Sequence, residues 1–335
     1  MSAPQVSPVD RPQAVEPARP RRRIGKPAET IGVGLGVVVV PWALLSPDLA
    51  AIKIVGAVLM YVALSSAWNL LGGYAGYLNF GSAMFLGVGA YTTAIISTNT
   101  GIGPLWTLPA AALLAAVVGL LVGVPGFRLR GDYFAVATFV LTLAMQQLAL
   151  ALSITGGAEG LSLQSPTESL ESAVRLFCLL FLGLAVVATL CCWVVERTRW
   201  FSALTAVKED EDAAEVLGVP TLRVKLTAFV VGAALSGAVG CFFAAQLLFL
   251  EPTGAFDFQV SLAVVVAAVI GGKGTWWGPA LGAIVTQLVL QQLLATVDGA
   301  WNQLIFGAVL VVVVLLLPRG IAGLVTKARG RRFGV

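Results

Sequence analysis

Histidine is absent from this chain of 335 residues, and charged residues make up only 11% of it against 58% hydrophobic residues. Soluble globular domains are about one quarter charged, so this composition excludes an ordinary soluble fold. The mean hydropathy is +0.91, and apolar runs of helical length recur without the alternation of a barrel. The sequence therefore predicts an all-α, polytopic transmembrane helical bundle.

Catalytic and metal-binding groups are also scarce. Without histidine, and with four cysteines that form no C-x-x-C pair, the chain lacks the usual ligands and bases of zinc, redox and hydrolase sites. Charge inside hydrocarbon is costly and is kept for ion coupling, yet no charged residue lies near the middle of an apolar run. We expect no catalytic residue, metal or cofactor, and the pattern disfavours a secondary transporter, a pump and a voltage sensor.

A nucleotide-binding loop is missing as well. The stretch IGGKGT, Ile270 to Thr275, contains a G-K pair but is not a phosphate-binding loop. Such a loop needs a glycine five residues before the pair, where this chain has Ala267, and Ser or Thr directly after the lysine, where it has Gly274. ATP-driven transport by this chain would need a separate ATPase polypeptide, with ATP and Mg bound there.

What is present is a series of apolar segments that predicts about 8–10 spans with glycine-broken helices. The first is short and contains Pro41, and the eighth, with only twelve residues, is too short to cross perpendicularly and is predicted to be re-entrant or half-buried. The ten segments are Ile31–Leu45, Leu49–Leu71, Phe80–Ser97, Leu105–Val124, Tyr133–Ser153, Val174–Val195, Leu226–Leu248, Gln259–Ile270, Pro279–Val297 and Trp301–Leu317.

The basic residues predict the orientation. If ten crossings start from a cytoplasmic N-terminus, all of the 21 Lys and Arg residues lie on the cytoplasmic side except Lys53 and Arg175. This distribution follows the positive-inside bias. We predict a disordered basic tail at 1–30, a permease domain at 31–320 and a basic tail at 321–335, with both termini cytoplasmic. The net charge of +4 is explained by this bias, so nucleic-acid binding is not expected.

Two glycine-rich breaks interrupt the apolar segments, GGYAGYLNFGSAMFLGVGAY at Gly72–Tyr91 and GGKGTWWGPALGA at Gly271–Ala283. Each is either a helix broken at membrane depth, which frees backbone groups for a solute, or a tight cytoplasmic hairpin. In the first break we predict that Asn79, Gly81 and Ser82 face a substrate path, although such neutral groups more often hydrogen-bond between helices.

Small residues four apart let helix backbones approach closely in lipid. This spacing predicts helix packing at Gly232, Ser236 and Gly240, and again at Gly278 and Gly282.

The charged central loop, 196–225, is the main exception to the apolar pattern. Its centre predicts an amphipathic helix from Glu209 to Gly218, which Gly218 and Pro220 end. The helix is either a solvated surface element or a coupling helix that lies in a groove of an ATPase. The candidate coupling residues are Glu209, Glu211, Asp212, Ala213, Ala214, Leu217 and Gly218.

Four separated blocks resemble the LivM-type permease subunits of branched-chain amino acid ABC importers. The resemblance covers roughly residues 50 to 320, and its blocks are Asn69–Tyr91, Arg128–Thr142, Lys208–Ala244 and Gly271–Ala283. It implies a bacterial inner-membrane permease with four kinds of partner: a homologous second permease, two cytoplasmic ATPases, an extracytoplasmic solute-binding protein and the bilayer.

The family's ATPase-contacting loop has the pattern E-A-A-x-x-x-G. This chain has Asp212, Ala213, Ala214 and Gly218 there, with Glu211 one place earlier, so either acid is a candidate for the family contact. The resemblance implies import of branched-chain amino acids, while related permeases carry urea, short amides or other amino acids. The alternative of another class is a stand-alone channel or facilitator.

Overall fold

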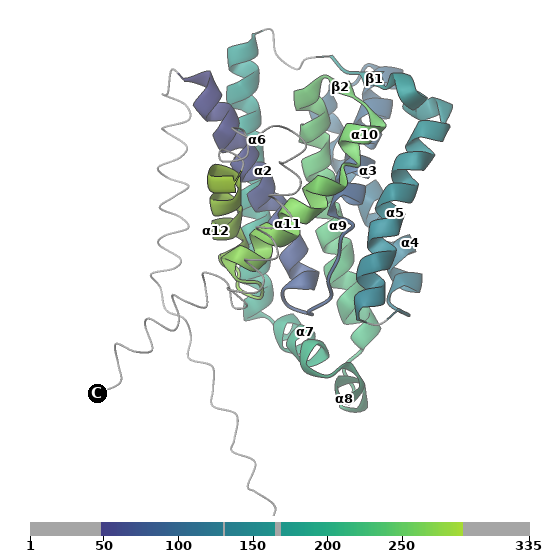
Figure 1. Ribbon diagram of the computed structural model, residues 1–335, viewed down its shortest axis with the longest axis vertical. Helices are drawn as coiled ribbons and strands as arrows, with labels where there is room; N and C mark the ends of the chain where they lie inside the picture. Colours follow the sequence, from purple (N-terminus) through teal and green to yellow (C-terminus); the bar gives the residue numbers. More distant parts are fainter. Residues whose placement is uncertain (1–47, 130, 165–168, 291–335) are drawn as a thin grey trace, which may run out of the picture.

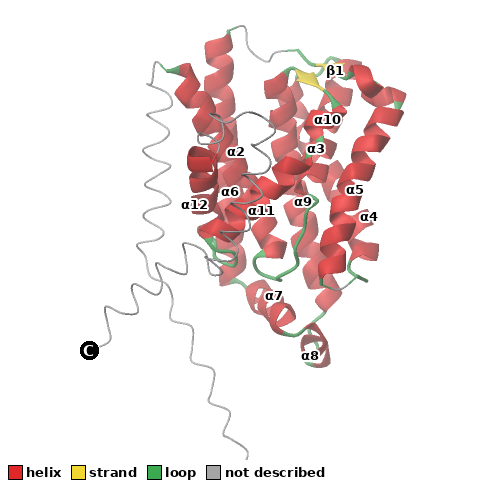
Figure 2. Cartoon of the chain, in the orientation of Figure 1, coloured by secondary structure: helices red, strands yellow, loops and turns green. Residues whose placement is uncertain are grey.

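The computed structural model describes residues 48–129, 131–164 and 169–290. Within them the chain forms a bundle of long helices, with two short helices beyond one end and a small strand pair at the other (Figures 1 and 2). The predicted segments Ile31–Leu45 and Trp301–Leu317, the end of Pro279–Val297 and both predicted tails lie outside the described residues.

The long helices follow the predicted segments closely. In chain order the helices are α2 (Leu49–Gly72), α3 (Ser82–Thr100), α4 (Leu108–Gly126), α5 (Asp132–Ala151), α6 (Leu170–Arg197), α7 (Arg199–Glu209), α8 (Glu211–Val216), α9 (Thr221–Leu247), α10 (Pro252–Ala255), α11 (Phe258–Gly271) and α12 (Gly278–Val285). Short 3-10 turns lie at Pro104–Thr107, Ser153–Thr155 and Gly157–Glu159, and a π-helical turn follows α12 at Thr286–Leu290.

Six helical stretches in the described residues are long and apolar enough to cross a membrane, so the chain is a multi-pass membrane protein. They are Leu49–Gly72, Pro104–Gly126, Asp132–Ala151, Leu170–Arg197, Thr221–Leu247 and Pro252–Gly271. The last stretch contains the predicted eighth segment and consists of two helices, since the extended Asp257 caps α11 through the Gln259 amide and separates it from α10. Helix α11 itself has 14 residues, so the re-entrant or half-buried path of this segment stays a prediction.

Helix α9 lies at the centre of the bundle, packed against α2, α3 and α4. Its small residues allow this contact. A Cβ built at Gly240 would lie 2.0 Å from the carbonyl oxygen of Leu86 in α3, and one at Gly232 would lie 2.9 Å from that of Ala67 in α2. Ser236, between them, is buried. The α9 backbone therefore touches two neighbouring helices directly.

Helices α11 and α12 form a hairpin with an equally close approach. A Cβ at Gly282 would lie 1.8 Å from the carbonyl oxygen of Ala267, and one at Gly278 would lie 2.4 Å from that of Gly272. Such distances leave no room for any side chain at these positions.

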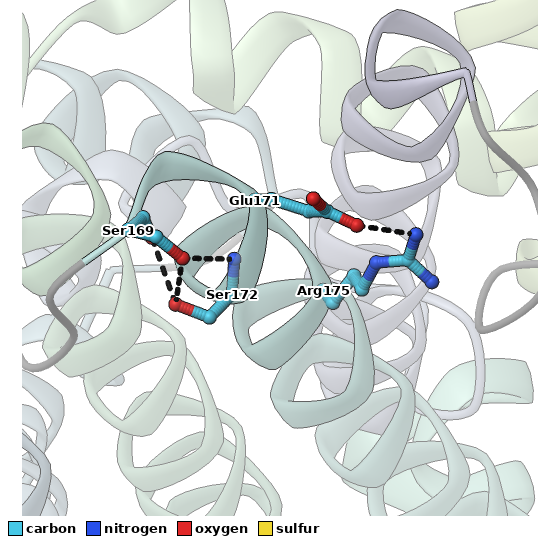
Figure 3. Close-up of polar contacts among 4 residues, drawn as sticks. All are labelled: Ser169, Glu171, Ser172 and Arg175. Carbon is cyan, nitrogen blue, oxygen red and sulfur yellow. Dashed lines mark hydrogen bonds and ion pairs between the residues drawn. The ribbon is translucent and has the colours of Figure 1, made fainter.

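The start of α6 shows how a long helix is capped at the membrane edge (Figure 3). The Ser169 hydroxyl accepts a hydrogen bond from the Ser172 amide at 3.2 Å, which satisfies one of the free amides of the first turn. One turn on, Arg175 pairs with Glu171 at 2.8 Å. Arg175 is one of the two basic residues that the topology prediction leaves outside, and a neighbouring carboxylate balances its charge.

The two ends of the bundle differ. At one end β1 (Leu161–Ser162) pairs antiparallel with β2 (Phe249–Leu250), a contact that the all-α prediction did not include. At the other end, which we name the α7–α8 end, α7 and α8 extend beyond the long helices (Figure 1). The functional candidates of the central loop therefore lie together at that end.

Candidate functional site

The central loop forms two helices rather than the single predicted helix from Glu209 to Gly218. Asp210 is extended (φ −158°, ψ 112°) and separates α7 from α8, and its side chain accepts a hydrogen bond from the Ala213 amide at 3.0 Å. Aspartate stabilises a helix more as an N-cap than in the interior, so the run of four acids divides at this residue. Gly218 ends α8 at φ +84°, as predicted.

The two faces of α8 differ in exposure. Ala214 is 2% exposed and packs inward, whereas Val216 and Leu217 are 88% and 82% exposed. Glu209, at the end of α7, and Asp212 and Ala213 on α8 are also exposed. Two large apolar side chains beside carboxylates thus form a small surface, which we name the α8 tip (Asp212, Val216 and Leu217).

The two adjacent acids of α8 have different surroundings. Glu211 lies against the bundle, where it pairs with the Lys225 ammonium at 2.5 Å and accepts a hydrogen bond from the Tyr77 hydroxyl. Asp212 lies on the exposed side. Glu211 therefore holds α8 to the bundle, whereas the side chain of Asp212 is exposed at the surface.

Helix α7 contacts both glycine-rich breaks. The Lys208 ammonium donates a hydrogen bond to the Gly73 carbonyl at 3.2 Å, and its stem packs against Gly76. Its nitrogen also lies 3.7 Å from where a Cβ of Gly274 would be. One side chain of the central loop thus reaches the two segments that the sequence singled out as breaks.

Asn69, in the last turn of α2, holds the second break. Its side-chain oxygen accepts a hydrogen bond from the Gly274 amide at 2.9 Å, and its side-chain nitrogen donates to the Thr275 carbonyl at 3.1 Å. Asn69 itself is fully buried. The bond pair fixes the 272–277 loop to α2.

Replacing Asn69 by leucine is expected to destabilise this junction. The part-buried Gly274 amide and Thr275 carbonyl would lose their partners, and roughly 1–3 kcal/mol for each group is the upper range of that loss. We expect a melting temperature several degrees lower for the purified protein in detergent. Asn99→Leu is the matched control, because Asn99 is exposed and bonds only within its own helix; equal melting temperatures for the two variants would contradict the assignment.

Tyr74 anchors the first break to α6. Its hydroxyl lies 3.2 Å from both the Cys192 carbonyl and a carboxylate oxygen of Glu196. Burial, together with the nearby Cys192 and Glu196, raises the pKa of Tyr74. The hydroxyl therefore stays protonated and remains a donor.

The loop of the first glycine-rich break runs from the α7–α8 end into the bundle before α3 begins (Figure 2). The Phe80 amide donates to the Thr138 hydroxyl at 3.0 Å, and the Thr142 hydroxyl donates to the Phe80 carbonyl at 3.3 Å. Thr138 lies six residues into α5, or about 9 Å along it. Helix α3 therefore starts inside the bundle, whereas the second break is a short hairpin loop between α11 and α12.

Asn79 and Ser82 both line one small cavity, which lies between α2, α3 and α9. Its volume is about 10 Å³, room for roughly one water molecule. Trp68 and Phe85 close it on two sides, and Ser236 of α9 adds a third polar group.

The amides at the start of α3 are not free. The Gly81 amide donates to the Asn79 side-chain oxygen at 2.8 Å, and the Ala83 amide donates to the Ser261 hydroxyl of α11 at 2.9 Å. Unwound backbone at membrane depth is tolerated where side chains satisfy it. Asn79 thus fixes the turn at Gly81 that precedes α3, and Ser261 satisfies an amide of its first turn. The hydroxyl of Ser82 is the simpler candidate for contact with a solute.

Sequence reasoning missed four residues that organise the α7–α8 end: Asn69, Tyr77, Lys208 and Lys225. The sequence does hold a signal for the two lysines. Each lies near an apolar segment, where a charged side chain needs a partner. Asn69 and Tyr77 have none, since neutral polar residues are common at helix ends.

The described residues contain no group of three His, Cys, Asp or Glu side chains that could hold a metal. The arrangement consists instead of long apolar helices, one helix start inside the bundle, and a short helix, α8, whose Glu211 is bonded to Tyr77 in the loop before α3. Such features are typical of a membrane transport subunit.

Comparison with known proteins gives the family. The model of the branched-chain amino acid transport system permease component matches residues 50–314, and the chain belongs to that family, whose members are transport subunits without a catalytic role. No solved structure matches the chain.

Individual relatives agree. The chain is 32% identical over 318 residues to the high-affinity branched-chain amino acid transport system permease protein LivM of Escherichia coli (strain K12), covering 86% of this chain and 73% of that protein. It is 30% identical over 236 residues to the autoinducer 2 import system permease protein LsrC of Enterobacter sp. (strain 638), covering 66% and 65%. To LivH of Salmonella typhimurium it is 23% identical over 282 residues, covering 78% and 91%.

Proposed function

We propose that this chain is a permease subunit of an ABC importer that moves branched-chain amino acids across the bacterial inner membrane, with both termini in the cytoplasm. The observation that carries the proposal is the similarity to LivM over 86% of the chain. A homologous second permease and an extracytoplasmic solute-binding protein complete the importer.

Two separate cytoplasmic ATPases drive transport, and one of them docks on the α8 tip of this chain. The exposed Val216 and Leu217 offer an apolar contact, and Asp212 fixes its orientation by charge. The helix-in-groove mode needs a short amphipathic helix that projects from its own protein, which is the geometry of α8.

Solute crosses beside the start of α3. Neutral donors and acceptors there suit a zwitterion that brings both of its own charges, and the positive end of the α3 dipole favours a carboxylate. The cavity at Ser82 is too small for an amino acid, so α3 and α9 separate during each cycle.

The test is uptake by the importer purified with its partner subunits and placed in proteoliposomes. We expect ATP-dependent accumulation of labelled leucine, reduced by excess isoleucine or valine. Downhill flux through the single chain, without ATPases, would instead support a channel. Saturable uptake of urea or a short amide, with leucine unable to compete, would overturn the substrate assignment.

A second candidate substrate follows from the similarity to LsrC, an autoinducer 2 import system permease protein. Autoinducer 2 added as a competitor distinguishes the two candidates in the same assay. Inhibition by autoinducer 2 but not by isoleucine would favour this alternative.

Ser82→Val is expected to lower leucine uptake severalfold. The substitution removes a hydroxyl and fills a cavity of about 10 Å³, while the bond from the Gly81 amide to Asn79 stays intact. Ser97→Val, on the same helix but away from the cavity, serves as the control. Uptake at the wild-type level in Ser82→Val would remove this residue from the path; Asn79→Leu is less informative, because it also removes the acceptor of the Gly81 amide.

A further inference from the structure

Lys225 is a buried cation at the α7–α8 end. It lies in the second turn of α9 and is 1% exposed. Removing an ammonium from water costs several kcal/mol unless it is paired and hydrogen-bonded. A cation in this position therefore depends on its partners.

Those partners come from separate parts of the chain. The ammonium lies 2.5 Å from a carboxylate oxygen of Glu211 and 3.1 Å from the Tyr77 hydroxyl. It also lies 4.7 Å from the ring centre of Tyr77 and 5.1 Å from that of Phe127, within the range of cation–π attraction. Since the Tyr77 hydroxyl donates to Glu211, the three polar groups form a closed triangle.

The triangle joins three segments that are otherwise distinct. Glu211 is the first residue of α8, Lys225 belongs to α9, and Tyr77 lies in the loop that climbs to α3. Tyr77 is followed by Leu78 and then by Asn79, whose side chain accepts a hydrogen bond from the amide of Gly81, the residue before α3. A displacement of α8 thus reaches the start of α3 through the short segment 78–81.

Aromatic packing holds the Tyr77 ring independently of its hydroxyl. The ring makes edge contacts with Phe127 and Phe134, at centroid distances of 5.8 Å and 5.6 Å. Phe127 and Phe134 in turn stack on each other at 4.9 Å. The ring and the hydroxyl can therefore be tested separately.

We propose that Lys225 is a positioning residue which, through the Tyr77 hydroxyl and Glu211, transmits the movement of α8 to the start of α3. The proposal rests on the proposed function, in which α8 is the docking helix of the ATPases. It assigns the link between docking and the solute path to three named side chains.

Tyr77→Phe tests the link, because it removes the hydroxyl and keeps the ring. In proteoliposomes with all subunits we expect ATP hydrolysis within about twofold of wild type, but at least a threefold rise in ATP hydrolysed per leucine transported. Lys225→Met should raise the same ratio at least as much. Combining Tyr77→Phe with Glu211→Gln should give less than the product of the single effects, as for residues of one network.

A purely structural role predicts a different pattern. ATP hydrolysis and uptake would then fall in proportion, together with the melting temperature, and the ratio would not change. That outcome, or a wild-type ratio in Tyr77→Phe, overturns the proposal. Tyr133→Phe is the matched control, since Tyr133 is 76% exposed and lies at the start of α5.

A readout that does not depend on the solute separates this proposal from the proposed function. Ala228→Cys places a thiol in the wall of the cavity, and its labelling by a membrane-permeant maleimide should change when ATP is added. Tyr77→Phe should abolish that change. If leucine is not transported but the labelling responds to ATP through Tyr77, the substrate assignment fails and the link stands; if labelling responds equally without the hydroxyl, the link fails.

Discussion

Gly240→Val is expected to abolish assembly of the folded permease. A Cβ at this position would lie 2.0 Å from the Leu86 carbonyl oxygen and 2.9 Å from the Ala90 nitrogen, and both are backbone atoms of α3. Overpacking against movable side chains costs about 1–3 kcal/mol. Here neither helix can yield by a rotamer change, so the cost is expected to exceed that range.

The measurement is the amount of monodisperse protein recovered after detergent extraction, which we expect to fall to about a tenth or less, given marginal folding stabilities. Gly183→Val is the matched control. Gly183 lies in the apolar helix α6, but nothing is within 4 Å of a Cβ built there. Near-normal recovery of Gly183→Val with loss of Gly240→Val would show that the α3–α9 contact is the cause; normal recovery of both would contradict it.

Asp212→Lys is expected to leave the permease folded and to prevent ATPase docking. Asp212 lies on the exposed face of α8, whereas its neighbour Glu211 is part-buried against Lys225. Placing like charges next to each other at an interface costs several kcal/mol. We expect at least tenfold less ATPase in co-purification and a matching loss of uptake.

The same reasoning predicts different effects for charge reversal at Asp212 and at Glu211, which the sequence alone could not tell apart. Glu211→Lys places a second cation beside the buried Lys225, so it should destabilise the chain itself, with a lower melting temperature. Glu171→Lys, an exposed reversal at the opposite end, should leave docking unchanged. If Asp212→Lys still co-purifies with wild-type amounts of ATPase, α8 is not the docking helix.

The fold was predictable because each long helix is one apolar run bounded by polar or glycine-rich residues. The starts of α2, α4 and α5 fall within a few residues of the predicted segments, as the physics of backbone hydrogen bonding in lipid requires. Gly218 and Pro220 after an amphipathic stretch predict a helix end, and Gly218 has φ +84°, a conformation that suits glycine. These features depend only on neighbouring residues.

Other features depend on residues far apart in the chain. The break at Asp210 was not predicted because an acidic run continues equally well as helix until one carboxylate caps the next turn. The roles of Glu211 and Asp212 could not be separated, since Lys225 and Tyr77 approach Glu211 only in three dimensions. The sequence could not distinguish the first break from a hairpin, because the hydroxyls of Thr138 and Ser261 that hold it belong to residues far along the chain.

Helix α9 is continuous over 27 residues, from its start beside α8 to its end at β2. At 1.5 Å per residue this is about 40 Å, the whole thickness of a membrane. Because an unbroken helix is stiff along its axis, a displacement of α9 at the β1–β2 end also displaces its other end, beside α8. Energetic coupling between two binding events is reciprocal. If a protein docks at the β1–β2 end, it should change the affinity for nucleotide at the α7–α8 end by the same factor as nucleotide changes the affinity for that protein.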